Sequence, residues 1–301
     1  MLVIDIRKTL KLNSEVEASL FPSGLQTFPA PAKLNLFLHV VGRRADGYHL
    51  LQTTFRFIDF SDRLAFTVRS DGIIKVMNPL SDLPEVDNLC TRAAKLLRDR
   101  SGKTLGVEIY LHKQIPMGGG LGGGSSDAAT TLIVLNRLWG INWDRARLMM
   151  LGLELGADVP VFIYGENAFA EGVGEKLTQL ALPPAWYVVL TPPVHILTAD
   201  IFACKELTRN TIPIKISAFS MGAGHNDLEP VAARMQPIVG DWLQWLKQQP
   251  GTSKVGMSGS GACLFAEFPE ASSALKVFER IPVDMCGFMA KGLAEHPLLH
   301  F

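Results

Sequence analysis

The stretch PMGGGLGGGSS, residues Pro116–Ser126, decides how the rest of the chain is interpreted. Six of the seven residues from 118 to 124 are glycine, and residues 127–139 carry apolar side chains at helical spacing. Glycine costs backbone entropy, and close approach of backbone N–H groups to a ligand is the usual reason for such a cluster. Because the loop leads into a helix, its N–H groups and the helix dipole can hold a phosphate, helped by the Ser125 and Ser126 hydroxyls. The alternative is a flexible surface loop with a serine N-cap.

Other nucleotide-binding loops fit the sequence less well. A Walker A loop needs Lys-Ser or Lys-Thr after the glycines, and neither follows. Gly118, Gly120 and Gly123 match a dinucleotide-binding fingerprint with Asp144 about 20 residues beyond, but the strands before the loop predict hairpins and no βαβ unit. A protein-kinase loop is excluded because no HRD or DFG sequence follows. A dinucleotide oxidoreductase stays as an alternative.

The composition is that of a globular chain without net charge. Its 301 residues are about twice the usual size of one domain, and 29 Lys+Arg balance 29 Asp+Glu. Zero net charge gives no general attraction for nucleic acid polymers or anionic membranes, so an anion must be bound at a local site. The longest stretch without Asp, Glu, Lys or Arg, residues 177–199, has four prolines and cannot form one spanning helix. We expect no membrane association and no obligate protein partner.

Four isolated cysteines, Cys90, Cys204, Cys263 and Cys286, form no CxxC or Cys/His pair. We expect buried, reduced thiols in a cytoplasmic protein, with no zinc or redox chemistry. Residues 1–28 begin with the apolar run MLVI, which acidic residues interrupt before a signal peptide or transit peptide can form. These residues are predicted to be a poorly ordered extension.

Residues 29–165 are predicted to form a first domain. Strands are expected within residues 32–76, where Asp71-Gly72 predicts a hairpin between the runs LAFTV and IIKVM. Asn88 is expected to cap a helix that ends at Gly102. An antiparallel sheet with helices follows from this pattern.

The chain after the glycine loop is predicted to close the first domain and build a second. A helix is expected from an Asp144 cap to Gly156, followed by a strand over residues 161–164. Residues 166–301 alternate between strand and helix patterns. They predict an antiparallel sheet with helices on one side, so the fold class is α+β with two domains.

Three further segments carry chemistry. Lys33 and Asn35 lie on one face of an otherwise apolar strand, and Asp158 lies between a helix end and small or apolar neighbours. Taken alone, Lys33 and Asn35 are equally well explained as a solvated strand face, and Asp158 as a turn residue. Beside a phosphate loop, however, a cation and a base are the groups that phosphoryl transfer requires. The glycine-serine turn of residues 256–261 is either a hairpin or a place where the second domain approaches bound phosphates.

In this order, the three segments resemble the motifs of the GHMP small-molecule kinases: P-x-x-x-N, a P-x-G-x-G-L-G-S/G-S-S loop and a G-S-G turn. PAKLNLFLHVVGRRADGYHLLQT, GADVPVF and GSGACLFAEF extend the resemblance to the members that phosphorylate a cytidine diphosphate derivative of methylerythritol. The resemblance covers residues 29–295. It implies an ATP-binding domain like ribosomal protein S5 domain 2 over residues 29–165 and a ferredoxin-like substrate domain over residues 166–301, with the active site between them.

The resemblance also implies the reaction and its catalytic residues. The γ-phosphate of ATP would pass to the tertiary 2-hydroxyl of methylerythritol, a step of non-mevalonate isoprenoid synthesis. Asp158 would accept the hydroxyl proton, and Lys33 would orient Asp158 and offset negative charge. The implied ATP contacts are Asn88, Lys113, Pro116, Met117, Gly118, Gly119, Gly120, Leu121, Gly122, Gly123, Gly124, Ser125 and Ser126.

For the cytidine end, the resemblance implies an aromatic sandwich with hydrogen bonds, built from Tyr48, His49 and Phe202. Thr198 matches a diphosphate or cytidine contact, although its neighbours LTAD lack the expected proline, and Asn35 belongs to the same substrate site. Plainer alternatives are a turn flank for Tyr48-His49, a helix cap for Asn88 and a solvated strand-end cation for Lys113.

Two other functions stay open beside this one. A homoserine or mevalonate kinase would share the fold, but Tyr48-His49 argues against it. A non-catalytic nucleotide-binding regulator would not need Lys33 and Asp158. Mg²⁺ is expected with ATP, yet no acidic cluster with metal-ligand spacing is visible, so its protein ligands are unknown.

Overall fold

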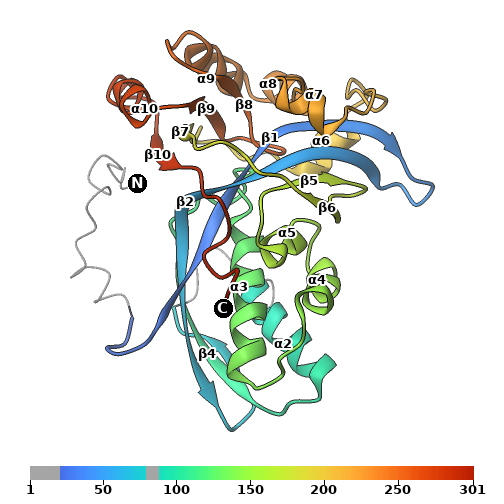
Figure 1. Cartoon of the computed structure of the whole chain (residues 1–301), viewed down its shortest axis with the longest axis vertical. Helices are drawn as coiled ribbons and strands as arrows, with labels where there is room; N and C mark the ends of the chain where they lie inside the picture. The colour runs from blue at the N-terminus through green and yellow to red at the C-terminus, as the bar shows by residue number, and fades with distance from the viewer. Residues whose placement is uncertain (1–20, 79–87) are drawn as a thin grey trace.

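The computed structural model describes residues 21–78 and 88–301, which form two β-sheets with helices packed on one face of each (Figure 1). Most of the predicted N-terminal extension lies outside the described residues, while Phe21 and Phe28 are buried. Among the described helices, none is both long and apolar enough to cross a membrane. All four cysteines are free thiols as expected, but Cys204 and Cys286 are only partly buried.

The first sheet is built around β2, which pairs with β1, β4 and β5. The predicted hairpin across Asp71-Gly72 is wrong. The turn forms, but β4 lies between the two runs and pairs antiparallel with β2 and parallel with β3, because its buried side chains offer a longer ladder than three-residue β3. The strands are β1 (Thr27–Arg43), β2 (His49–Arg69), β3 (Ile74–Val76), β4 (Gly106–His112), β5 (Ala168–Glu171) and β6 (Lys176–Gln179).

The helices against this sheet are α2 (Leu89–Ser101), α3 (Gly123–Leu138), α4 (Arg145–Leu153) and α5 (Val159–Tyr164). Asn88 caps α2 by accepting from the Cys90 N–H, and Asp144 caps α4 by accepting from the Arg147 N–H, as predicted. The strand predicted over residues 161–164 is wrong, because these residues form α5. Pro160 suits the first turn of a helix, and the segment is buried on all sides, so its apolar run gave no helical period.

The second sheet has the order β10-β7-β9-β8, antiparallel throughout. With helices in the β7–β8 and β9–β10 connections, this is the ferredoxin-like arrangement, and the predicted sheet with helices on one side is confirmed. The strands are β7 (Trp186–Leu190), β8 (Lys254–Met257), β9 (Leu264–Phe268) and β10 (Gly287–Lys291). The helices are α6 (Thr198–Ala203), α7 (Ile216–Ser220), α8 (Glu229–Met235), α9 (Pro237–Lys247) and α10 (Ala271–Phe278).

Long strands tie the two halves together. In Figure 1, β1 and β2 run from the first sheet up to the second half, where Leu38 and Val40 of β1 enter the second hydrophobic core. A third core lies between the sheets and includes Leu34 and Tyr187. After β10 the chain returns to the first half, where Leu298 is buried. This packing fixes the glycine loop against residues of the second half.

Candidate active site

A cavity of about 680 Å³ lies where the glycine loop, β1, the start of α5 and the segment before α6 meet. Most of the predicted site residues line it. They are Lys33, Asn35, Asn88, Lys113, the loop from Pro116 to Ser125, Asp158, Thr198 and Phe202. Tyr48, His49 and Ser126 are not among the lining residues, and the Ser126 side chain is fully buried.

The glycine loop needs glycine for steric reasons at several positions, of which Gly120 and Gly122 are two. Gly120 has φ +75°, and a Cβ there would collide with the Ser258 carbonyl oxygen. Gly122 has φ +73°, and a Cβ would lie 2.9 Å from the Phe162 ring and 3.0 Å from Lys33 Cε. Gly122 is also the N-cap of α3 and has no side chain to occupy the first N–H groups of that helix. Those groups are therefore left for a ligand.

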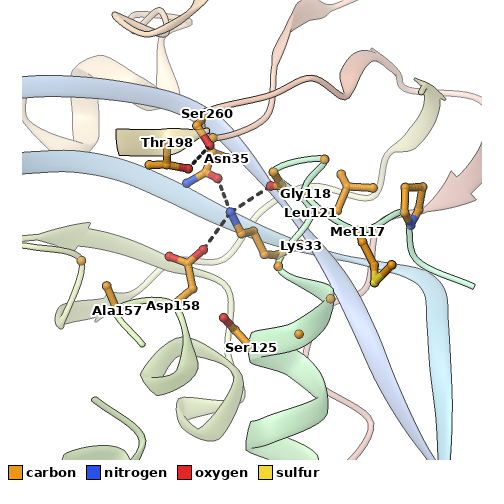
Figure 2. A pocket seen from close by; sticks show the side chains of 18 of the residues that line it. Lys33, Asn35, Met117, Gly118, Leu121, Ser125, Ala157, Asp158, Thr198 and Ser260 are labelled. Carbon is orange, nitrogen blue, oxygen red and sulfur yellow. Dashed lines mark hydrogen bonds and ion pairs between the residues drawn. The ribbon is translucent and has the colours of Figure 1, made fainter. Parts of the chain in front are cut away.

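Lys33 lies at the centre of the site, with Asn35 and Asp158 on either side of its ammonium group (Figure 2). Its Nζ donates to Asn35 Oδ1 at 2.5 Å and to the Gly120 carbonyl at 3.0 Å, and forms an ion pair with Asp158 Oδ2 at 3.1 Å. An ammonium group has three N–H donors, and all three are used here. The Lys33 side chain is therefore fixed in position.

Asp158 is the exposed partner of this pair. Its side chain is 36% exposed, against 3% for Lys33. Asp158 immediately precedes α5, but its carboxylate does not cap that helix. The described part of the chain offers the carboxylate no other partner than Lys33. One face of it is therefore open to a substrate in the cavity.

The glycine-serine turn of the second half lies against the loop. Ser258 Oγ donates to the Gly120 carbonyl at 2.9 Å and accepts from the Asn35 N–H at 3.1 Å. Gly259 and Ser260 line the cavity. Ser260 Oγ lies 2.7 Å from Thr198 Oγ1, and Figure 2 labels both side chains. The sequence indicated this turn, but it did not identify Gly259 and Ser260 as site residues.

Lys113 belongs to a buried cluster that the sequence analysis missed. Its Nζ pairs with Asp62 Oδ2 and, at 2.7 Å, with Asp127 Oδ2. Asp62 Oδ1 accepts the N–H groups of Gln114 at 2.6 Å and Ile115 at 2.9 Å, just before the glycine loop. Burial raises the pKa of Asp127 to about 8, with Lys113 opposing the shift. The alternative that Lys113 is a solvated cation is therefore wrong. In the sequence, the only sign of this cluster is Asp127, the acidic residue directly after Ser126.

The structure brings His49 and Phe202 together. Their rings are stacked, with centroids 4.6 Å apart and planes at 19°. Arg209 Nε lies 3.3 Å from His49 Nε2, and burial, followed by the charge of Arg209, lowers the pKa of His49. Tyr48, in contrast, is exposed. Asn88 lines the cavity and also caps α2, as predicted for a helix cap.

His195 also lines the cavity, and sequence reasoning did not find it. Its imidazole ring fills the space beside Gly118 where a Cβ would otherwise be. The residue lies in a segment of prolines and apolar residues, which gave no motif.

Comparison with known proteins agrees with this geometry. Two family models match the chain, GHMP kinases N terminal domain over residues 88–166 and GHMP kinases C terminal over residues 209–284. A protein of Nitrosomonas europaea named 4-diphosphocytidyl-2-C-methyl-D-erythritol kinase is 71% identical, over 92% of this chain and 100% of its own length. One of the same name from Nitrosospira multiformis is 59% identical over 98% of each chain.

Solved structures give the same result. A crystal structure titled 4-(cytidine 5'-diphospho)-2C-methyl-D-erythritol kinase has a TM-score of 0.76 and 35% identity, over 89% of this chain and 99% of that one. A homoserine kinase from Cytophaga hutchinsonii has a TM-score of 0.62 at 18% identity, over 92% of this chain and 97% of that one, which shows a shared fold alone.

Proposed function

Because the chain belongs to the GHMP kinases, in the family of 4-diphosphocytidyl-2-C-methyl-D-erythritol kinases, we propose that it phosphorylates that compound with ATP on its 2-hydroxyl. It is an ATP-dependent kinase, and its relatives' names place the reaction in isoprenoid precursor synthesis. The Lys33–Asp158 pair on the wall of the cavity carries the proposal. An open carboxylate held by a fixed cation beside a phosphate-binding loop is the arrangement that phosphoryl transfer to a hydroxyl needs.

In the proposed mechanism Asp158 is the base. Its carboxylate accepts the proton of the 2-hydroxyl as that oxygen attacks the γ-phosphorus, and the bond to the leaving ADP oxygen breaks. Since the transition state is loose, most of the acceleration comes from positioning and charge stabilisation. The exposed face of Asp158 is the part of the carboxylate that a substrate hydroxyl can reach.

Lys33 positions the base and offsets charge. Its contacts with Asn35 and the Gly120 carbonyl fix the ammonium between the base and the glycine loop. Negative charge that develops on the acceptor oxygen and the transferred group is therefore met by a cation that needs no reorganisation.

The glycine loop, from Pro116 to Ser125, and the first turn of α3 are proposed to bind the phosphates of ATP, with Asn88 and Lys113 toward the adenine. Among the described residues, no group of three His, Cys, Asp or Glu side chains could hold a metal ion, and the cavity carboxylates Asp127 and Asp158 are paired with lysines. We therefore propose that Mg²⁺ arrives on the phosphates of ATP, where it neutralises their charge.

The cytidine diphosphate end is proposed to bind at His49, Phe202, Thr198 and Asn35, with exposed Tyr48 closing over the base. The His49–Phe202 stack and the Thr198–Ser260 contact support this assignment. We further propose that residues 29–165 provide the ATP site and residues 166–301 the substrate domain, after an extension of residues 1–28. Four free thiols support a cytoplasmic location.

A coupled assay of ADP formation tests the proposal. The purified protein is given ATP with the cytidine diphosphate substrate, with homoserine or with mevalonate, and the phosphorylated carbon is located by phosphorus NMR. We expect turnover with the cytidine substrate alone and a 2-phosphate product. Turnover with homoserine or mevalonate would mean that this compound is the substrate in place of the cytidine derivative. Tight ATP binding without transfer to any acceptor would indicate a regulator.

A further inference from the structure

The lysines that line the cavity are each paired with a carboxyl group. The lining side chains of this kind are Lys33, Lys113, Asp127 and Asp158. Lys33 is paired with Asp158, and Lys113 is paired with Asp127 and with buried Asp62 behind it. A triphosphate and a diphosphate, which the proposed function brings into this cavity, would therefore meet no lysine that is free of a carboxylate.

His195 is the exception among the basic side chains of the cavity wall. Its imidazole lies against Gly118, where the glycine loop begins and where a Cβ would collide with ring atoms Nδ1 and Cε1. Within residues 21–78 and 88–301, His195 has no ion-pair or hydrogen-bond partner, although its ring lines the cavity. An imidazole takes up a proton near neutral pH and then donates from both nitrogens, a good match for phosphate oxygens.

We propose that His195 binds a phosphate oxygen of the bound substrates as an imidazolium ion, supplying the positive charge that the paired lysines do not. The inference rests on the proposed function, since it needs two phosphorylated ligands in the cavity. The phosphate belongs either to the triphosphate of the donor or to the diphosphate of the acceptor, and the two sources share the same chemistry.

The segments beside His195 carry few charged side chains. The glycine loop and the Ser258–Gly261 turn have no charged side chain, and the segment of residues 191–197 has no other titratable side chain. Asp200 on α6 is the nearest acidic residue along the chain, and the cavity wall adds the paired Lys33, Lys113, Asp127 and Asp158. Phosphate is thus the dominant negative charge that His195 would meet.

The test compares His195→Gln, which keeps polarity without charge, with His195→Lys, which keeps charge at every pH. The KM values for ATP and for the cytidine substrate are measured separately between about pH 6 and pH 9, with His300→Gln as the control at an exposed histidine far along the chain. For His195→Gln we expect about a tenfold higher KM for one substrate at low pH, with kcat little changed. In the native protein and the control that KM should rise with pH, while His195→Lys should keep it low throughout.

The substrate whose KM responds identifies the source of the phosphate. Equal KM values and pH profiles in His195→Gln and the native protein would overturn the inference. Failure of the native protein to phosphorylate the cytidine substrate would instead overturn the proposed function. A direct readout is the proton uptake on binding a non-hydrolysable ATP analogue or the cytidine substrate, measured by calorimetry in two buffers. It should fall in His195→Gln for the same substrate whose KM responds.

Discussion

Lys33 and Lys113 line the same cavity and are each paired with aspartate, yet their surroundings differ. Lys33 meets Asp158, whose side chain is 36% exposed, whereas Lys113 meets Asp62 and Asp127, whose side chains are 0% and 4% exposed. A carboxylate that is one-third exposed can be reached by a substrate hydroxyl, whereas carboxyl groups that are 0% and 4% exposed are almost fully covered by protein. We therefore propose that the same kind of ion pair serves catalysis at Lys33–Asp158 and anchors the glycine loop at Lys113.

The two pairs should differ in energy as well as in role. Removing one partner of a fully buried pair leaves an uncompensated charge and is strongly destabilising. Asp158 is partly solvated, and without it Lys33 keeps its contacts with Asn35 and the Gly120 carbonyl, so its loss should cost less stability than the loss of Asp62. Asp62 also accepts two backbone N–H groups at the start of the glycine loop, so its loss affects the loop directly. Activity and stability are thus expected to separate between the two lysines.

The largest effect is expected for Asp158→Asn. Loss of the base should lower kcat about 10³-fold, with the KM for ATP and the urea midpoint of unfolding almost unchanged. Steady-state kinetics and urea unfolding measure the three quantities. Asp71→Asn is the matched control, since Asp71 is 43% exposed and paired with Arg69 away from the cavity. Near-native turnover in Asp158→Asn would contradict the assignment of this residue as base.

Asp62→Asn should show the opposite pattern. It leaves Lys113 with one partner and weakens the bonds to Gln114 and Ile115, so the free energy of unfolding should fall by about 3 kcal/mol. Urea unfolding followed by circular dichroism measures the loss. If the folded fraction keeps native kcat, the anchoring role is supported. A kcat loss as large as that of Asp158→Asn, with native stability, would mean that both pairs take part in the chemistry.

The Lys113 cluster should also make stability depend on pH. Burial raises the pKa of Asp127 to about 8, above its ordinary value near 4 in the unfolded chain. Between these two pKa values the folded protein holds a proton that the unfolded chain has released, so the free energy of unfolding falls as the pH rises. Lys113, whose pKa is also raised, stabilises the fold fully below its ordinary value near 10, and that contribution is lost only as the pH rises above this value.

Between about pH 5.5 and pH 7.5 the free energy of unfolding should therefore fall by about 2 kcal/mol because of Asp127. Asp127→Asn should lose this slope, and Asp158→Asn should keep it. Urea unfolding at the two pH values compares the three proteins. Equal slopes in native protein and Asp127→Asn would show that Asp127 is ionised in the fold throughout this range.

The sequence predicted the Lys33–Asp158 pair better than it predicted the cluster of Lys113 with Asp62 and Asp127. Lys33, Asp158 and the glycine loop are recognisable because their residue types and local spacing are tied to chemistry. Asp62 is 51 residues from Lys113, and its role depends on β2 meeting β4, a pairing that the predicted hairpin across Asp71-Gly72 displaced. Contacts between distant segments leave no local period or motif.

The same limit explains the other errors. Residues 161–164 are apolar on every side because α5 is buried, so the sequence carried no helical period there. His195 reaches Gly118 only through the folding of the second half over the loop. Element caps such as Asn88 and Asp144 were predictable because capping depends on neighbours within three residues.

Arg209 is a third basic residue whose N–H donors bond to other groups of the protein. Its Nη2 donates to the carbonyls of Phe202 at 2.8 Å and Cys204 at 2.7 Å, and its Nε donates toward His49 Nε2. It thereby holds the Phe202 backbone and, after burial, contributes to the lowered pKa of His49. Arg209 should accordingly position the substrate end without touching the ATP end.

Arg209→Gln is expected to raise the KM for the cytidine substrate about fivefold and to leave the KM for ATP unchanged, because it loosens contacts worth about 1 kcal/mol in net terms. Arg234→Gln is the matched control, since Arg234 is exposed and its ion pair with Glu206 spans 3.9 Å. A parallel rise in both KM values would mean that Arg209 stabilises the second half as a whole. A rise confined to the KM for the cytidine substrate would show that Arg209 positions the residues that bind this substrate, as Lys33 is proposed to position Asp158.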